Sequence, residues 1–143
     1  MMFTKDYTGE DVTYKNSMAV LKGDEKTLAD VGSGKVRKSS PSDHVFVYFA
    51  DHGAPGFIAF PEDELSAMDL NRTINKHVRK KQHENNIYGK MVIYIEAYES
   101  GSMFENILPN NIKVYTTTAV KTPLMPADKR DTYLGDSFSV HWK

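Results

Sequence analysis

Two apolar runs dominate the hydrophobic pattern of this chain, and each stops abruptly in polar residues and a glycine. The first run is His44 to Ala50, followed by Asp51-His52-Gly53, and the second is Met91 to Ile95, followed by Glu96-Ala97-Tyr98-Glu99-Ser100-Gly101. Continuous runs of β-branched and aromatic residues are typical of strands that are buried on both faces. The stretch between them contains one strongly helical segment and is long enough for a crossover. We therefore expect two parallel, neighbouring strands.

The remaining pattern completes an α/β arrangement. Thr13 is a suitable N-cap for a helix over 14–22, with Gly23 as its stop. A second helix is expected over 67–84, because Leu70, Ile74 and Val78 form one apolar stripe and Ser66 to Asp69 resembles a capping box. Further strands are expected at 57–60, 112–118 and 133–142, and a short helix at 104–108. The glycines of Gly32-Ser33-Gly34 do not follow a strand, so they lack the context of a phosphate-binding loop.

The polar residues that end the two apolar runs are the candidate site. Ligands of open parallel sheets bind just beyond the carboxyl ends of the strands. His52 is a candidate general base, since histidine titrates near neutral pH. The residue two positions beyond the second strand is Tyr98, and the nearby hydroxyls of Ser100 and Ser102 carry no sign of activation. A lone histidine at a strand end is more often structural than catalytic, so the pattern alone leaves both roles open.

Composition narrows the function classes. The 143 residues fit a single domain or part of one, with 40% hydrophobic residues, 26% charged residues and a net charge of −1. This charge gives no indication of nucleic-acid or membrane-surface binding. No apolar stretch approaches the roughly 18 residues of a membrane span. The first residues lack the apolar core of a signal peptide, and we expect neither a metal nor a cofactor.

The absence of cysteine has the largest consequence. With no cysteine in the sequence, the chain can form no disulfide, no thiolate metal site and no thiol nucleophile.

Several motifs, in order along nearly the whole chain, resemble the legumain family of asparaginyl endopeptidases, also called vacuolar processing enzymes. They are Lys5 to Thr13, Gly32 to Val36, Asp43 to Phe46 with Asp51-His52-Gly53, Asp69-Leu70-Asn71, Tyr94 to Ala97 with Glu99 to Ser102, and Thr132 to Asp136. The resemblance implies a caspase-like three-layer sandwich with a mostly parallel sheet.

The resemblance also assigns roles. It implies that His52 is the catalytic base, that Gly53 contributes an oxyanion-hole N–H, and that Glu96 and Asp136 help to form an acidic pocket for asparagine. The family's nucleophile is a cysteine in a Glu-Ala-Cys-Glu-Ser-Gly pattern, and this chain has Tyr98 there. A phenol stays protonated at acidic pH and is a poor nucleophile, so we expect peptidase activity to be lost.

Two further departures concern length. The family has two strands and a helix before the region that matches Lys5, including an Arg-His pair of the asparagine pocket. The segment between Thr118 and Asp136 is also shorter than in the family, and a pocket serine lies in the missing stretch. We therefore expect residues 1–143 to be a single, partial peptidase domain that lacks the family's first strands. This would leave 44–50 as an apolar sheet edge through which the chain could self-associate.

Four interpretations remain open. The chain could be an inactive legumain homologue, a module that binds a peptide substrate or inhibitor without cleaving it, a relative of the transamidase that attaches lipid anchors, or a partial product of an active legumain. The transamidase also depends on cysteine. Resemblance implies a lysosomal, vacuolar or secreted location, in which Asn71 of the sequon Asn71-Arg72-Thr73 could be glycosylated.

Overall fold

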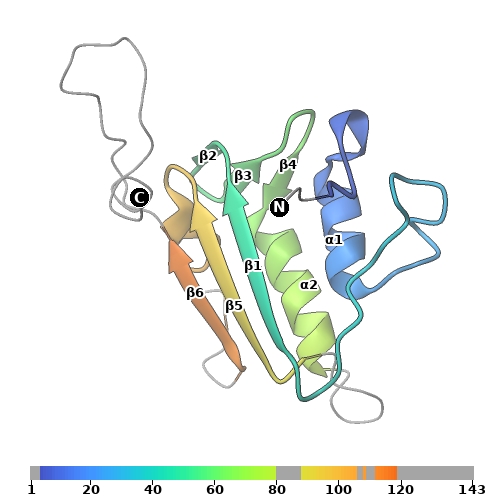
Figure 1. Ribbon diagram of the computed structural model, residues 1–143. Helices are drawn as coiled ribbons and strands as arrows, with labels where there is room; N and C mark the ends of the chain where they lie inside the picture. The colour runs from blue at the N-terminus through green and yellow to red at the C-terminus, as the bar shows by residue number, and fades with distance from the viewer. Residues whose placement is uncertain (1–3, 80–87, 106–107, 109–111, 119–143) are drawn as a thin grey trace.

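The computed structural model describes residues 4–79, 88–105, 108 and 112–118 of the chain. Its elements, in chain order, are η1 (Gly9–Asp11), α1 (Tyr14–Lys22), β1 (His44–Ala50), β2 (Gly53–Ala54), β3 (Phe57–Ala59), β4 (Glu64–Ser66), α2 (Ala67–Arg79), β5 (Lys90–Glu96), η3 (Ser100–Met103) and β6 (Val114–Thr118). Figure 1 shows the three long strands side by side with α1 and α2 beyond them.

The two apolar runs form neighbouring parallel strands, as the sequence predicts. The main sheet has the order β1-β5-β6, and both of its pairings are parallel. In the register of the first pair, His44 lies opposite Lys90 and Ala50 lies opposite Glu96. A separate antiparallel sheet, β2-β3-β4, follows the carboxyl end of β1. The mostly parallel α/β class is thereby confirmed.

Helix α1 begins and ends where its capping residues predict. The Thr13 hydroxyl oxygen accepts a hydrogen bond from the Asn16 backbone N–H at 3.2 Å. Gly23 ends the helix in the left-handed conformation, with a φ of 70°, which glycine adopts at little steric cost. One face of α1, with Tyr14, Met18 and Leu21, packs against the core.

Helix α2 covers the same face of the sheet. The Ser66 hydroxyl oxygen accepts from the Asp69 N–H at 3.1 Å and donates to the Asp69 carboxylate at 2.9 Å, so the capping prediction is confirmed. Leu70 and Ile74 are buried in one cluster with the inward residues of β5. The expected continuation to residue 84, and the side chain of Val78, lie outside the described residues.

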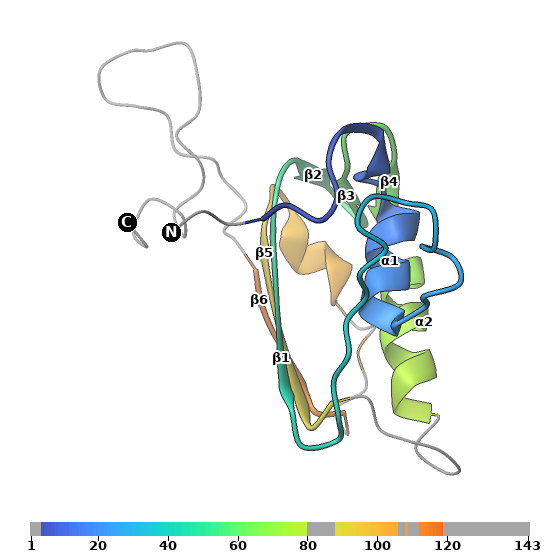
Figure 2. The same ribbon diagram turned by 45° about the vertical axis from the view of Figure 1, so that its right-hand side comes forward.

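The prediction that both runs are buried on two faces is wrong. Exposure alternates along β1, and the inward side chains of β5 are buried while their neighbours are not. Phe46 and Tyr48 are 61% and 55% exposed on the outer face. All helices of the described chain lie on one side of the sheet (Figure 2), so this part of the protein contributes two layers of the expected three-layer sandwich. Apolar sequence alone does not reveal whether a second face is covered.

Three local expectations differ from the structure or cannot be compared with it. A helical turn lies at Ser100–Met103, directly after β5, whereas the one expected at 104–108 falls partly on residues 106–107, which lie outside the described residues. Strands β2 and β4 are too short to leave a hydrophobic pattern in the sequence. The strand expected at 133–142 lies outside the described residues.

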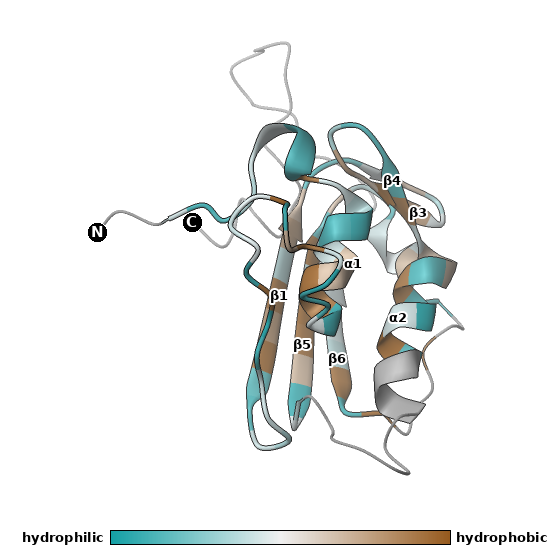
Figure 3. Ribbon diagram, turned by 90° about the vertical axis from the view of Figure 1, so that its right-hand side faces the viewer, coloured by the Kyte–Doolittle hydropathy of each residue, from teal (hydrophilic) through white to brown (hydrophobic). Residues whose placement is uncertain are grey.

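An apolar cavity lies between β1 and the helices. Its volume is about 520 Å³, and its lining includes Met18 and Leu21 of α1 and the inward residues Val45, Val47 and Phe49 of β1. Figure 3 shows the apolar stretches along β1 and β5, with α1 and α2 beside the sheet. Within the described residues β1 pairs with β5 on one side, so the sheet ends beside this cavity.

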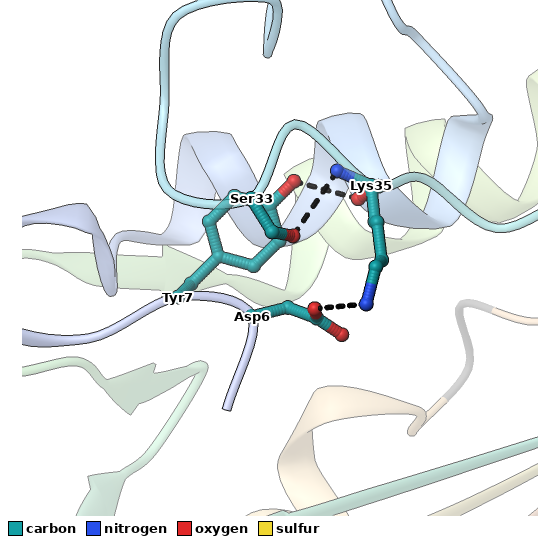
Figure 4. A network of polar contacts seen from close by, with 4 residues as sticks. All are labelled: Asp6, Tyr7, Ser33 and Lys35. Carbon is teal, nitrogen blue, oxygen red and sulfur yellow. Dashed lines mark hydrogen bonds and ion pairs between the residues drawn. The ribbon is translucent and has the colours of Figure 1, made fainter. Parts of the chain in front are cut away.

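The glycine-containing loop at 32–35 packs against the N-terminal segment (Figure 4). The Ser33 N–H donates to the Asp6 carbonyl at 2.8 Å, and the Tyr7 hydroxyl donates to the Lys35 carbonyl at 2.6 Å. The Lys35 ammonium bonds the Asp6 carboxylate at 2.8 Å and, with a smaller contribution from Ser33, lowers the pKa of that carboxyl. These amides and charges are paired within the protein, which supports a structural role for the loop.

No helix in the described part of the chain combines the length and apolar character needed to cross a bilayer.

Candidate functional site

The carboxyl ends of β1 and β5 meet at one edge of the sheet. The Asp51 N–H donates to the Glu96 carbonyl at 3.2 Å, immediately after the last paired residues of the two strands. Gly53 then lies against the next turn, because a Cβ added there would be 2.6 Å from the Tyr98 carbonyl oxygen and 3.0 Å from Ala97 Cβ. The segments that carry His52 and Tyr98 therefore come together at the same sheet end.

His52 and Tyr98 are both open to solvent. His52 is exposed, and its backbone is fixed on both sides: its N–H donates to the Asp51 carboxylate at 2.7 Å, and its carbonyl accepts from Ala59 at 2.9 Å. Tyr98 is 46% exposed. A group from solvent can therefore reach the space beside both residues.

The turn after Tyr98 has an unusual backbone conformation. Glu99 has a φ of 55° and a ψ of 17°, and among the described residues it is the single non-glycine residue with a positive φ. This left-handed conformation costs roughly 1–2 kcal/mol for a residue with a Cβ. It persists only where surrounding contacts enforce it, and such positions cluster at functional sites.

The two serines after Tyr98 are part of the scaffold. Ser100 is fully buried, and its hydroxyl donates to the Ile95 carbonyl at 3.3 Å. The Ser102 hydroxyl donates to the Glu99 carbonyl and accepts from the Gly56 N–H, both at 2.7 Å. These bonds explain the serines in the motif without a nucleophilic role.

Glu96 lies on the outer face of the sheet, next to Tyr48. The Tyr48 hydroxyl donates to the Glu96 carboxylate at 2.7 Å and fixes one of its oxygens. The sequence reasoning missed Tyr48. The register of the sheet explains the contact, since Ala50 lies opposite Glu96 and side chains two positions apart share a face.

For two other candidate residues, Asp136 and Asn71, the structure supports no role in this site. Asp136 lies outside the described residues. Asn71 lies within α2, and Thr73 of the same sequon is 5% exposed, so the folded protein does not present the sequon as an open loop. The described residues contain no group of histidine, aspartate and glutamate side chains that could hold a metal ion.

One family model and several curated proteins match this chain. The model of the peptidase C13 family matches residues 2–143. The chain is 53% identical to legumain of Rattus norvegicus and 52% identical to legumain of Homo sapiens, over alignments of 143 positions that cover 96% of this chain and 32% of each relative. It is 46% identical to the vacuolar-processing enzyme delta-isozyme of Arabidopsis thaliana, covering 96% of this chain and 31% of that protein. The chain thus spans about a third of the length of these curated relatives.

Proposed function

Because the chain belongs to the peptidase C13 family, we propose that it is a legumain-type asparaginyl endopeptidase homologue in which hydrolysis has been lost. The observation that carries this proposal is Tyr98 at the end of β5, in a chain without cysteine. Similarity to legumains and vacuolar-processing enzymes suggests a lysosomal, vacuolar or secreted location for the protein.

The family mechanism needs a thiolate beside a base. In that mechanism His52 would take the proton of the nucleophile, and the Gly53 N–H would stabilise the oxyanion that forms on the scissile carbonyl. Here the group beside them is a phenol, which is a weak nucleophile where it is protonated. Neither Ser100, which is buried, nor Ser102, whose hydroxyl bonds two backbone groups, offers a replacement.

Peptide binding without cleavage is the second candidate function. It is favoured by the Glu96 carboxylate, which Tyr48 orients at the same sheet edge as the exposed His52. A carboxylate oxygen accepts a hydrogen bond from an amide N–H₂ group, so Glu96 could select an asparagine side chain, assisted by Asp136.

The test is turnover of a fluorogenic asparaginyl peptide at pH 5–7 by the purified chain and by its Tyr98→Cys variant. We expect no turnover above background from the wild type. The variant should gain labelling by a thiol-directed probe but little turnover, because the resemblance places part of the asparagine pocket outside these residues and lost positioning costs orders of magnitude in rate.

Binding is measured in parallel by fluorescence polarisation of the same asparaginyl peptide. Glu96→Gln should weaken binding, whereas Glu62→Gln, in the exposed turn before β4, serves as the control. Wild-type turnover that persists through further purification would refute the loss of hydrolysis. Equal affinity of the wild type and the Glu96→Gln variant would refute the binding function.

A further inference from the structure

Ser102 connects two loops that carry the candidate catalytic residues. One loop is the turn at Tyr98 and Glu99, directly after β5. The other is the β2–β3 hairpin, which begins at Gly53 and turns at Gly56. The Ser102 hydroxyl bonds both loops, since it donates to the Glu99 carbonyl and accepts from the Gly56 N–H, each at 2.7 Å.

The contact with Glu99 is reinforced by the backbone. The Ser102 N–H donates to the same Glu99 carbonyl at 2.9 Å, so this carbonyl accepts two hydrogen bonds from one residue. Glu99 is the described residue that carries a left-handed backbone despite having a side chain. The paired bonds therefore fall where the strained conformation needs external support.

The contact with Gly56 fixes the hairpin at its turn. Gly56 has a φ of 85°, and its carbonyl accepts from the Ala67 N–H at 2.8 Å, at the start of α2. The hairpin is thus held between α2 on one side and Ser102 on the other. At its other end, Gly53 already touches the Tyr98 carbonyl.

We propose that Ser102 is a positioning residue, which sets the Tyr98–Glu99 turn against the His52–Gly53 loop through its single hydroxyl. The coupling of the two loops is independent of the proposed function. Its consequence, the alignment of a bound peptide, rests on that function. Ser102 itself need not touch the peptide. The same hydroxyl would serve a family member that carries a nucleophile at position 98.

The first experiment needs no peptide. Amide hydrogen exchange and ¹H–¹⁵N spectra are recorded for the wild type, Ser102→Ala, Ser102→Thr and the control Ser42→Ala, which changes an exposed serine before β1. Loss of the hydroxyl should speed exchange at Gly56 by about tenfold, the equivalent of one net hydrogen bond. The Gly53 and Glu99 signals should shift with it, while Ile93 in the core stays unchanged.

Threonine keeps the hydroxyl and should restore both the exchange rate and the spectra to near wild-type values. A general loss of stability would instead speed exchange at Ile93 as well, and would overturn the inference. The inference would also be overturned if the Ser102→Ala variant gave wild-type signals at Gly53, Gly56 and Glu99.

The second experiment measures the consequence, with the polarisation assay for the asparaginyl peptide. Ser102→Ala should weaken binding by about tenfold, and Ser102→Thr should restore it. Unchanged affinity despite a perturbed hairpin would overturn the positioning role. If the wild type binds no peptide, the proposed binding function fails, whereas the loop coupling is still decided by the exchange data.

Discussion

At the scale of single residues, Gly53 shows how closely the two strand ends approach. Its neighbours are the Tyr98 carbonyl and Ala97 Cβ, which leave no room for a side chain. The glycine in Asp51-His52-Gly53 is therefore required by packing, independently of any oxyanion hole. A residue of a sequence motif can thus be required both by packing and by catalysis.

Gly53→Ala tests this packing. The added Cβ would lie 2.6 Å from backbone oxygen, so the loop must shift, and we expect a loss of about 1–3 kcal/mol in the free energy of unfolding. The control is Gly101→Ala, whose Cβ would lie 3.7 Å from the Thr118 hydroxyl, an ordinary contact. Urea denaturation measures both, and equal effects of the two substitutions would contradict the close approach at Gly53.

At the scale of elements, α1 depends on its caps as much as on its packing. The helix has nine residues, is shorter than isolated helices need to be for stability, and buries only one face. Thr13 satisfies one of its free N–H groups, and Gly23 ends it. The capping residues are local signals, which is why the sequence predicted both ends correctly.

Thr13→Ala should lower the free energy of unfolding by about 1 kcal/mol, since the Asn16 N–H loses its acceptor. Lys15→Ala, two residues further on at an exposed position of the same helix, should change it by less than about 0.5 kcal/mol. Thermal unfolding followed by circular dichroism compares the two. A Thr13→Ala variant as stable as Lys15→Ala would show that the cap contributes nothing.

At the scale of the whole molecule, the described sheet ends at β1, whose outer face exposes the aromatic side chains of Phe46 and Tyr48. Strand β1 carries neither charge nor proline between Val45 and Ala50, and its inward residues line the 520 Å³ cavity. Edge strands without such protection pair with other chains. Pairing with a second copy would give the backbone groups of β1 new partners.

We accordingly expect the purified 143-residue chain to self-associate, as measured by size-exclusion chromatography with light scattering. Phe46→Lys places a charge at a 61% exposed position of β1 and should shift the population towards monomer. Met68→Lys, equally exposed but on α2, is the matched control and should leave the association unchanged. A wild type that stays monomeric at every concentration would refute pairing through β1.

The sequence by itself determined the elements whose signals are local. The two apolar runs specified β1 and β5, and the caps specified the starts of α1 and α2. The polar ends specified that the segments of His52 and Tyr98 lie at one edge of the sheet, because parallel strands share a carboxyl edge. The tyrosine at position 98, in a chain without cysteine, was also a matter of sequence, since it depends on residue type alone.

Only the tertiary structure decided which contacts the polar residues make. Apolar residues on both faces of β1 predicted burial of both faces, yet Phe46 and Tyr48 on the outer face are exposed among the described residues. Coverage of a face depends on other segments and not on the strand itself. The bonds of Tyr48 to Glu96 and of Ser102 to Gly56 join residues 48 and 46 positions apart. No periodicity records such pairs, since hydrogen bonds between distant segments follow from register and chain path, which the fold sets as a whole.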